Sequence, residues 1–114
     1  MFNNKNIWVI VEVDEEGKAR NVGIELLSPA KKMADEINEE VVALIIGSPT
    51  DDAVEEVKKH GVSKIINVTG DVYKEYNTEV YTNAICTLVN KYEPNVILIG
   101  ATNQGRDLGP RVSS

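Results

Sequence analysis

The sequence is poor in the residues that build most metal sites and covalent-catalysis sites. It holds one cysteine, Cys86, and one histidine, His60, among 114 residues. A lone cysteine excludes a disulfide within the chain and favours a reducing compartment, so we expect a cytoplasmic protein. One thiol and one imidazole do not make up the usual ligand sets, and we therefore predict no metal site. We also find no nucleophile–base constellation and predict no catalytic residue.

Basic residues and long apolar runs are also in short supply. Twelve lysines and arginines stand against eighteen aspartates and glutamates, which gives a net charge of -6. Because nucleic acids attract basic surfaces, we predict no nucleic-acid binding. No apolar run approaches the roughly 20 residues that a membrane-spanning helix needs, so we predict no membrane span. Residues 1–6 lack the apolar stretch of a secretory signal.

What the sequence does contain is an alternation of apolar runs and helical patterns. Apolar-rich segments predict strands at residues 7–13, 41–46, 64–68 and 96–99. The apolar runs at 7–11, 41–46 and 96–99 are unbroken, as strands covered on both faces require. Apolar residues at helical spacing predict a helix after each of the first three strands. We therefore expect the α/β class, with a three-layer, Rossmann-like parallel sheet and right-handed crossovers.

The ends of the expected helices are less well defined than the strands. Ser28 and Pro29 fit the N-cap and first residue of the first helix, although that helix can also start near Ile24. Thr78 is expected to cap the third helix. Asp107 is the expected cap of a fourth helix, and the sequence ends soon after this helix would begin. We therefore expect residues 1–114 to be a single domain, truncated in its fourth helix and incomplete at its C-terminus.

The loop after the fourth strand is the main candidate for binding. Gly100 and Gly105 have the spacing that opens a P-loop, but Arg106 and Asp107 stand where a P-loop needs lysine and serine or threonine. We therefore reject a nucleotide triphosphatase. Gly100, Thr102, Gly105 and Arg106 remain weak cofactor-binding candidates, because backbone N–H groups of such a turn can face an anion. Alternatively the glycines only permit a tight turn, which is the commoner reason for them.

The expected sheet topology places this loop at a particular point. In the common doubly wound order, the first and fourth strands lie side by side at the centre of the sheet. Ligands of such sheets bind where the strand order reverses, at the carboxyl ends of the strands. The crevice would then lie between the loop after Val13 and the loop after Gly100.

Three segments resemble a known family. Residues 7–12 (IWVIVE), 23–34 (GIELLSPAKKMA) and 100–112 (GATNQGRDLGPRV) resemble the start of the electron transfer flavoprotein alpha subunit, the FixB family. The resemblance covers nearly the whole chain, and its last segment is the most specific.

The resemblance implies half of a heterodimer with an electron transfer flavoprotein beta subunit. It implies an electron carrier that accepts electrons from dehydrogenases, or takes part in flavin-based bifurcation. In this family the FAD-binding motifs lie in the C-terminal domain, so FAD is expected to bind outside this fragment. The N-terminal domain is expected to have an adenine-nucleotide-hydrolase-like fold, with its crevice generally empty, and to act as scaffold and subunit interface.

A second reading is a small ATP- or AMP-binding module of the universal stress protein type. The alternating α/β pattern and the loop between Gly100 and Gly105 motivate it. That reading needs a glycine and a serine or threonine cluster at the start of the next helix, where this sequence has Gly109, Pro110 and Arg111.

Overall fold

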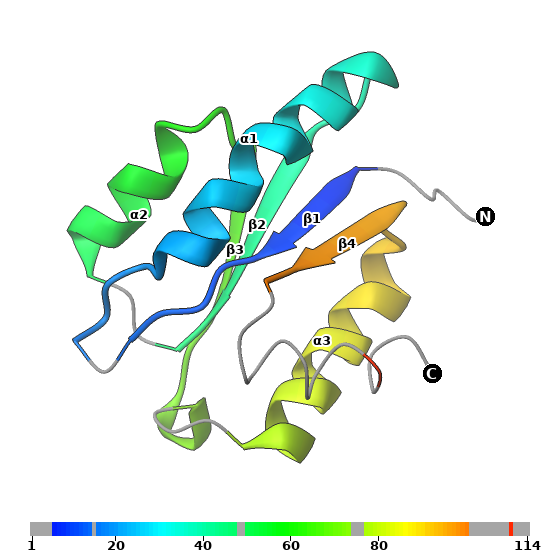
Figure 1. Ribbon diagram of the computed structural model, residues 1–114. Coiled ribbons are helices and arrows are strands. Elements are labelled where there is room, and N and C mark those ends of the chain that lie inside the picture. Colours follow the sequence, from blue (N-terminus) through cyan, green and yellow to red (C-terminus); the bar gives the residue numbers. More distant parts are fainter. Residues whose placement is uncertain (1–5, 15, 48–49, 74–76, 101–109, 111–114) are drawn as a thin grey trace.

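The protein folds around a four-stranded parallel sheet in the order β3-β2-β1-β4 (Figure 1). The structure, a computed structural model, describes residues 6–14, 16–47, 50–73, 77–100 and 110. The strands are β1 (Ile7–Ile10), β2 (Val41–Ile46), β3 (Lys64–Val68) and β4 (Val96–Ile99). Every pairing between them is parallel. The predicted α/β class is confirmed, and so is the adjacency of the first and fourth strands.

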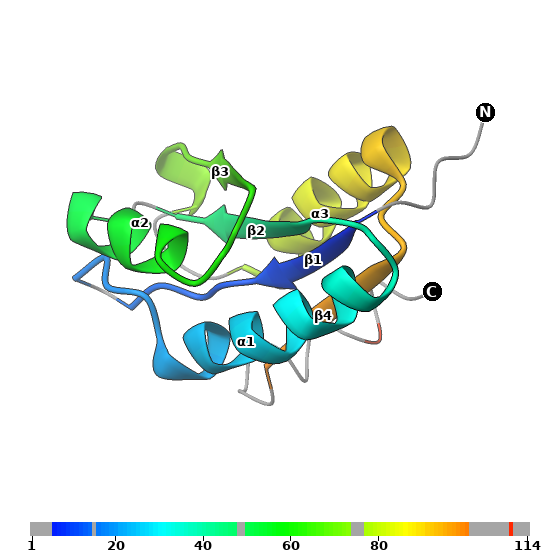
Figure 2. The same cartoon turned by 90° about the horizontal axis from the view of Figure 1, so that it is seen from above.

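Helices cover both faces of this sheet, which gives the expected three layers. Helices α1 (Asn21–Glu36) and α2 (Asp51–Lys58) lie on one face, and α3 (Thr78–Tyr92) lies on the other (Figure 2). A short 3-10 helix, η1 (Asp71–Tyr73), precedes α3. The crossover from β3 back to β4 therefore passes over the opposite face from the first two crossovers, and the strand order reverses between β1 and β4.

Two apolar clusters hold the layers together, one on each face of the sheet. Odd-numbered residues of β1, such as Ile7 and Val9, pack towards α1 and α2. Even-numbered residues, such as Trp8 and Ile10, pack towards α3, whose buried residues are Tyr81 and Ile85. Every residue of β1 and β2 is buried, as their unbroken apolar sequences require.

Helix α1 begins earlier than either sequence reading placed it. Its N-cap is Arg20, and Pro29 lies inside the helix, so the reading of Ser28 and Pro29 as the helix start is wrong. The alternative start near Ile24 is closer but still late. Pro29 removes one hydrogen bond to the carbonyl of Glu25. Both residues are exposed, so water can reach that carbonyl.

The N-caps of α2 and α3 are of the residue types that favour this position, but the cap of α3 lies one residue before the predicted one. Asn77 caps α3, because its Oδ1 accepts a hydrogen bond of 3.1 Å from the N–H of Val80. Thr78, the predicted cap, is instead the first residue of the helix. Thr50 caps α2 in the same way, accepting from the N–H of Ala53 at 3.2 Å. The two side chains at positions 77 and 78 are both good caps, so the local sequence did not decide between them.

The first strand is shorter than predicted. It ends at Ile10, and Val13 forms an isolated antiparallel bridge with Ala19 instead of extending the sheet. The expected cap of the fourth helix, Asp107, lies outside the described residues, whereas Pro110 is helical. No helix in the described part of the chain is long and apolar enough to cross a bilayer.

Candidate functional site

The candidate site is the carboxyl edge of the sheet between β1 and β4. These strands pair in register, Ile10 opposite Ile99, so the segments that follow them leave the sheet side by side. Glu12 follows β1, and Gly100 follows β4. The start of α1 lies beside both. This is the reversal point at which open α/β sheets place their ligands, and it is where the sequence predicted a crevice.

Gly100 is the one weak binding candidate whose placement the structure describes. It is buried, and a Cβ at this position would lie 2.8 Å from Cγ1 of Val22 in α1. Real Cβ atoms essentially never come so close to another atom, so the glycine is needed for contact between β4 and α1. Thr102, Gly105 and Arg106 lie outside the described residues, and their role stays a prediction.

Glu12 is a buried carboxylate that the sequence reasoning did not single out. Its side chain is 6% exposed, and its Oε1 lies 3.9 Å from Nε of Arg20, the N-cap of α1. The N–H of Arg20 also donates to the carbonyl of Glu12 at 2.8 Å. Because a buried glutamate is rarely found without a partner, this pair contributes to the accommodation of Glu12. A carboxylate directly after an unbroken apolar strand was the signal that could have revealed it.

The Glu12–Arg20 contact sets opposite charges side by side at the end of β1. The carboxylate and the guanidinium offset each other, so this pair carries no net charge. The guanidinium of Arg20 is half-exposed.

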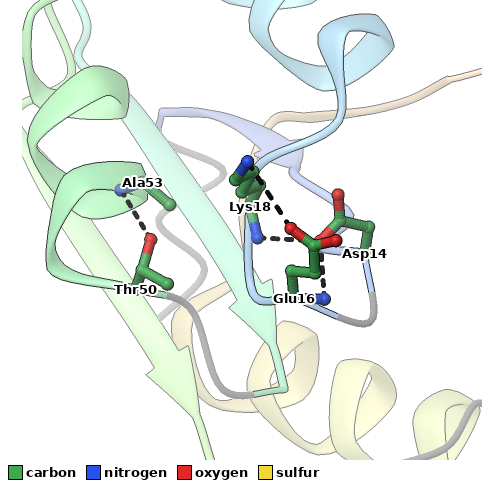
Figure 3. Close-up of polar contacts among 5 residues, drawn as sticks. All are labelled: Asp14, Glu16, Lys18, Thr50 and Ala53. Atoms are coloured by element: carbon green, nitrogen blue, oxygen red, sulfur yellow. Dashed lines mark hydrogen bonds and ion pairs between the residues drawn. The ribbon is translucent and has the colours of Figure 1, made fainter.

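The connection from β1 to α1 is held by a compact turn (Figure 3). Oδ1 of Asp14 accepts hydrogen bonds from the N–H groups of Glu16 at 2.9 Å and Lys18 at 3.0 Å. The N–H of Thr50 donates to the carbonyl of Gly17 at 2.9 Å, which joins this turn to the start of α2. The turn is thus anchored to the start of α2.

Asp14 is expected to titrate below its ordinary value. The hydrogen bond from the N–H of Lys18 is the largest influence and lowers the pKa of Asp14 below 3.8. Desolvation opposes it, and the hydrogen bond from the N–H of Glu16 lowers the pKa further. A lowered folded-state pKa means that the contribution to stability is present at neutral pH. It is lost as the pH falls from about 4 through the folded pKa. Carbon-detected NMR titration should therefore give a midpoint below 3.8 for Asp14.

The Asp14→Asn variant is the control for this titration. Its difference in stability from the parent chain should shrink as the pH falls through the same window. A midpoint at or above the ordinary value, or a difference that does not depend on pH, would contradict the turn geometry.

A second polar contact fixes the segment after β3 at the same edge. The hydroxyl of Tyr81 in α3 donates to the carbonyl of Tyr73 at 3.0 Å, and the two rings meet edge to face at 6.0 Å. Burial raises the pKa of Tyr81. This hydroxyl therefore remains a donor at neutral pH and holds η1 against α3.

The remaining sequence candidates lie away from this edge. Cys86 is half-buried in α3, as expected, and His60 lies in the turn after α2. Among the described residues, no three histidine, cysteine or acidic side chains form a group suited to a metal ion. The predictions of no metal and no catalytic residue stay predictions.

Comparison with known proteins gives one consistent family. Residues 7–114 match the family model described as electron transfer flavoprotein domain. The chain is 44% identical over 110 residues to the electron transfer flavoprotein subunit alpha of Megasphaera elsdenii, covering 96% of this chain and 32% of that protein. It is 39% identical over 110 residues to the acryloyl-CoA reductase electron transfer subunit beta of Anaerotignum propionicum, and this match covers 96% of this chain and 30% of that protein.

A third relative is the protein FixB of Clostridium saccharobutylicum, 34% identical over 110 residues and again covering 96% of this chain and 32% of that one. The chain thus spans about a third of the length of these relatives. Among solved structures, a universal stress protein in complex with cAMP superposes with a TM-score of 0.54 at 14% identity, covering 96% of this chain and 88% of that chain. That likeness concerns the fold alone.

Proposed function

The chain belongs to the electron transfer flavoprotein family, and from this membership we propose that it is the N-terminal α/β domain of an electron transfer flavoprotein alpha subunit. In this proposal, residues 1–114 act as a scaffold and as a subunit interface. The intact alpha subunit pairs with a beta subunit in the cytoplasm, and the heterodimer carries FAD at residues outside this stretch. It accepts electrons from dehydrogenases and passes them to an acceptor, so it is a carrier and not a catalyst on its own.

One observation carries this proposal. Relatives named as electron transfer subunits match nearly all of this chain, yet the chain spans only about a third of their length. Most of each relative's length therefore lies outside the matched stretch, and in this proposal the cofactor-binding residues lie in that unmatched part.

The test is a binding measurement with matched ligands. The purified chain is titrated with FAD, AMP and ATP in separate experiments, followed by calorimetry and, for FAD, by flavin fluorescence. We expect no binding tighter than about 1 mM, which corresponds to roughly 4 kcal/mol. In parallel, the chain is mixed with the beta subunit encoded by the same genome, and complex formation is followed by sedimentation. We expect a complex of one copy of each.

The same measurements decide the alternative. A stoichiometric complex with AMP or ATP would favour a nucleotide-binding module of the universal stress protein type. Tight FAD binding by the chain alone would contradict the placement of the flavin outside this stretch. Failure to bind the beta subunit, with the chain folded by circular dichroism, would contradict the interface role.

A further inference from the structure

The outer edge of the sheet at β3 is open in the structure. β3 is the last strand on its side of the sheet, and within the described ranges no strand pairs with its outer side (Figure 2). The edge backbone groups of such a strand are available to another chain. Lys64 and Asn67 are exposed, and Ile65 and Ile66 are only partly buried, whereas β1 and β2 are buried throughout. β3 therefore has both the backbone and the apolar surface to accept a further strand.

A groove runs along this edge. It has a volume of about 520 Å³ and lies between α2 and β3. Its walls include Val54 and Lys58 from α2 and, from the segment that forms β3, Val62, Lys64, Ile65 and Asn67. Two of the lining residues are lysines and none is acidic. The groove thus offers an apolar wall on the α2 side of β3, whereas the ammonium of Lys64 lies over the Tyr92 ring of α3, on the other side of the sheet.

Positive charge is concentrated further at the start of β3. Nζ of Lys64 lies 5.3 Å from the centre of the Tyr92 ring, and Nζ of Lys91 lies 5.1 Å from the same centre. Trp8 supports that ring from the sheet, with ring centres 6.0 Å apart. In the part of the chain that the structure describes, neither ammonium has a carboxylate within 4.0 Å. Two like charges thus converge on one ring without an anion between them.

These features indicate what kind of strand could pair with the open edge of β3. A lysine on an edge strand discourages pairing with apolar strands, but it attracts a strand that carries carboxylates. A second copy of this chain would bring the same lysines to the same edge. Lys58 is already paired with Glu55 at 3.6 Å, in an exposed contact that contributes little, whereas Lys64 and Lys91 have no ion pair with a described residue and can meet a partner's carboxylates.

We propose that the open edge of β3 receives an extended acidic segment of a partner polypeptide. Its backbone adds a strand beside β3, and its carboxylates lie against Lys64 and Lys91. This is the peptide-binding mode in which main-chain hydrogen bonds supply affinity and alternate side chains supply specificity. The inference stands on the geometry of this edge and does not depend on the proposed function.

The probe is a fluorescein-labelled peptide of eight residues that alternates valine and glutamate, measured by fluorescence anisotropy with the whole chain at low salt. We expect binding that is lost with a peptide methylated on alternate backbone nitrogens. Binding should weaken at least tenfold when glutamine replaces each glutamate. Lys64→Gln should weaken binding about fivefold, because it removes one exposed charge pair. Amide signals of residues 64–68 should shift in NMR spectra.

Lys32→Gln is the matched control, since it removes the same charge from an exposed position on α1. It should leave peptide binding unchanged. The proposal is overturned if the glutamine peptide or the methylated peptide binds as tightly as the first, or if Lys32→Gln and Lys64→Gln have equal effects. It is also overturned if sedimentation shows a dimer whose formation protects the β3 amides from exchange, because a second copy would then be the occupant.

Discussion

Replacing Ile85 with alanine is expected to lower the free energy of unfolding by about 3 kcal/mol. Ile85 is fully buried, and with Tyr81 it is one of two buried residues that attach α3 to the sheet. α3 is the helix that covers the second apolar cluster, which includes Trp8 and Leu44. The substitution removes three carbons and leaves a cavity beneath that helix. Urea denaturation followed by far-ultraviolet circular dichroism measures the loss.

The matched control is Leu88→Ala in the same helix. Leu88 is only partly buried, so its loss should cost about 1 kcal/mol. In thermal unfolding, Ile85→Ala should lower Tm by roughly 10 °C. Equal losses for the two variants would mean that α3 is not seated as described. A loss below about 1 kcal/mol for Ile85→Ala would mean the same.

Replacing Gly23 with leucine is expected to destabilise the fold by about 3 kcal/mol, through overpacking instead of a cavity. Gly23 is buried in the first turn of α1, and a Cβ there would lie 3.1 Å from Cα of Val11. That neighbour is backbone and cannot rotate away. A longer side chain must therefore push the start of α1 off the sheet, beside the contact between Glu12 and Arg20.

Gly23→Ala separates the steric effect of the longer side chain from the gain in helix propensity that any replacement of glycine brings. Alanine improves helix propensity by about 1 kcal/mol, and the close contact with Val11 offsets that gain, so we expect a small net change. Denaturant melts of both variants, with the NMR signals of Arg20 and Val22 as local probes, test this. If leucine were tolerated as well as alanine, the approach of α1 to β1 would be looser than the structure has it.

The strands were predictable because short apolar segments between polar turns leave a clear mark in the sequence, and the mark is clearest in β1 and β2, which are buried throughout. Residues 41–46, 64–68 and 96–99 were predicted as they are observed. The order of strands also followed, since alternating strands and helices with right-handed crossovers leave few choices. The start of α1 was not predictable in the same way. It depends on the fit of Gly23 against Val11, which is a contact between segments and not a local preference.

The candidate site, too, was predictable only in part. The reversal point between β1 and β4 followed from the alternation of elements, and Gly100 lies there. The role of Glu12 did not follow, because one carboxylate after a strand resembles the start of any polar turn. Its pairing with Arg20 brings together the end of a strand and the start of a helix across an intervening turn. Thr102, Gly105 and Arg106 stay predictions.

The pairing of β1 with β4 has a consequence for the order in which the protein assembles. Ile7 pairs with Val41 on one side and with Val96 on the other, although Val96 is made much later. During synthesis, β1, β2 and β3 can associate while one side of β1 still lacks its neighbour. The last pairing must close a loop that spans most of the chain, so refolding should take milliseconds to seconds. Until then the nascent chain exposes an apolar strand that invites misassembly, and chaperones have the most to shield at that stage.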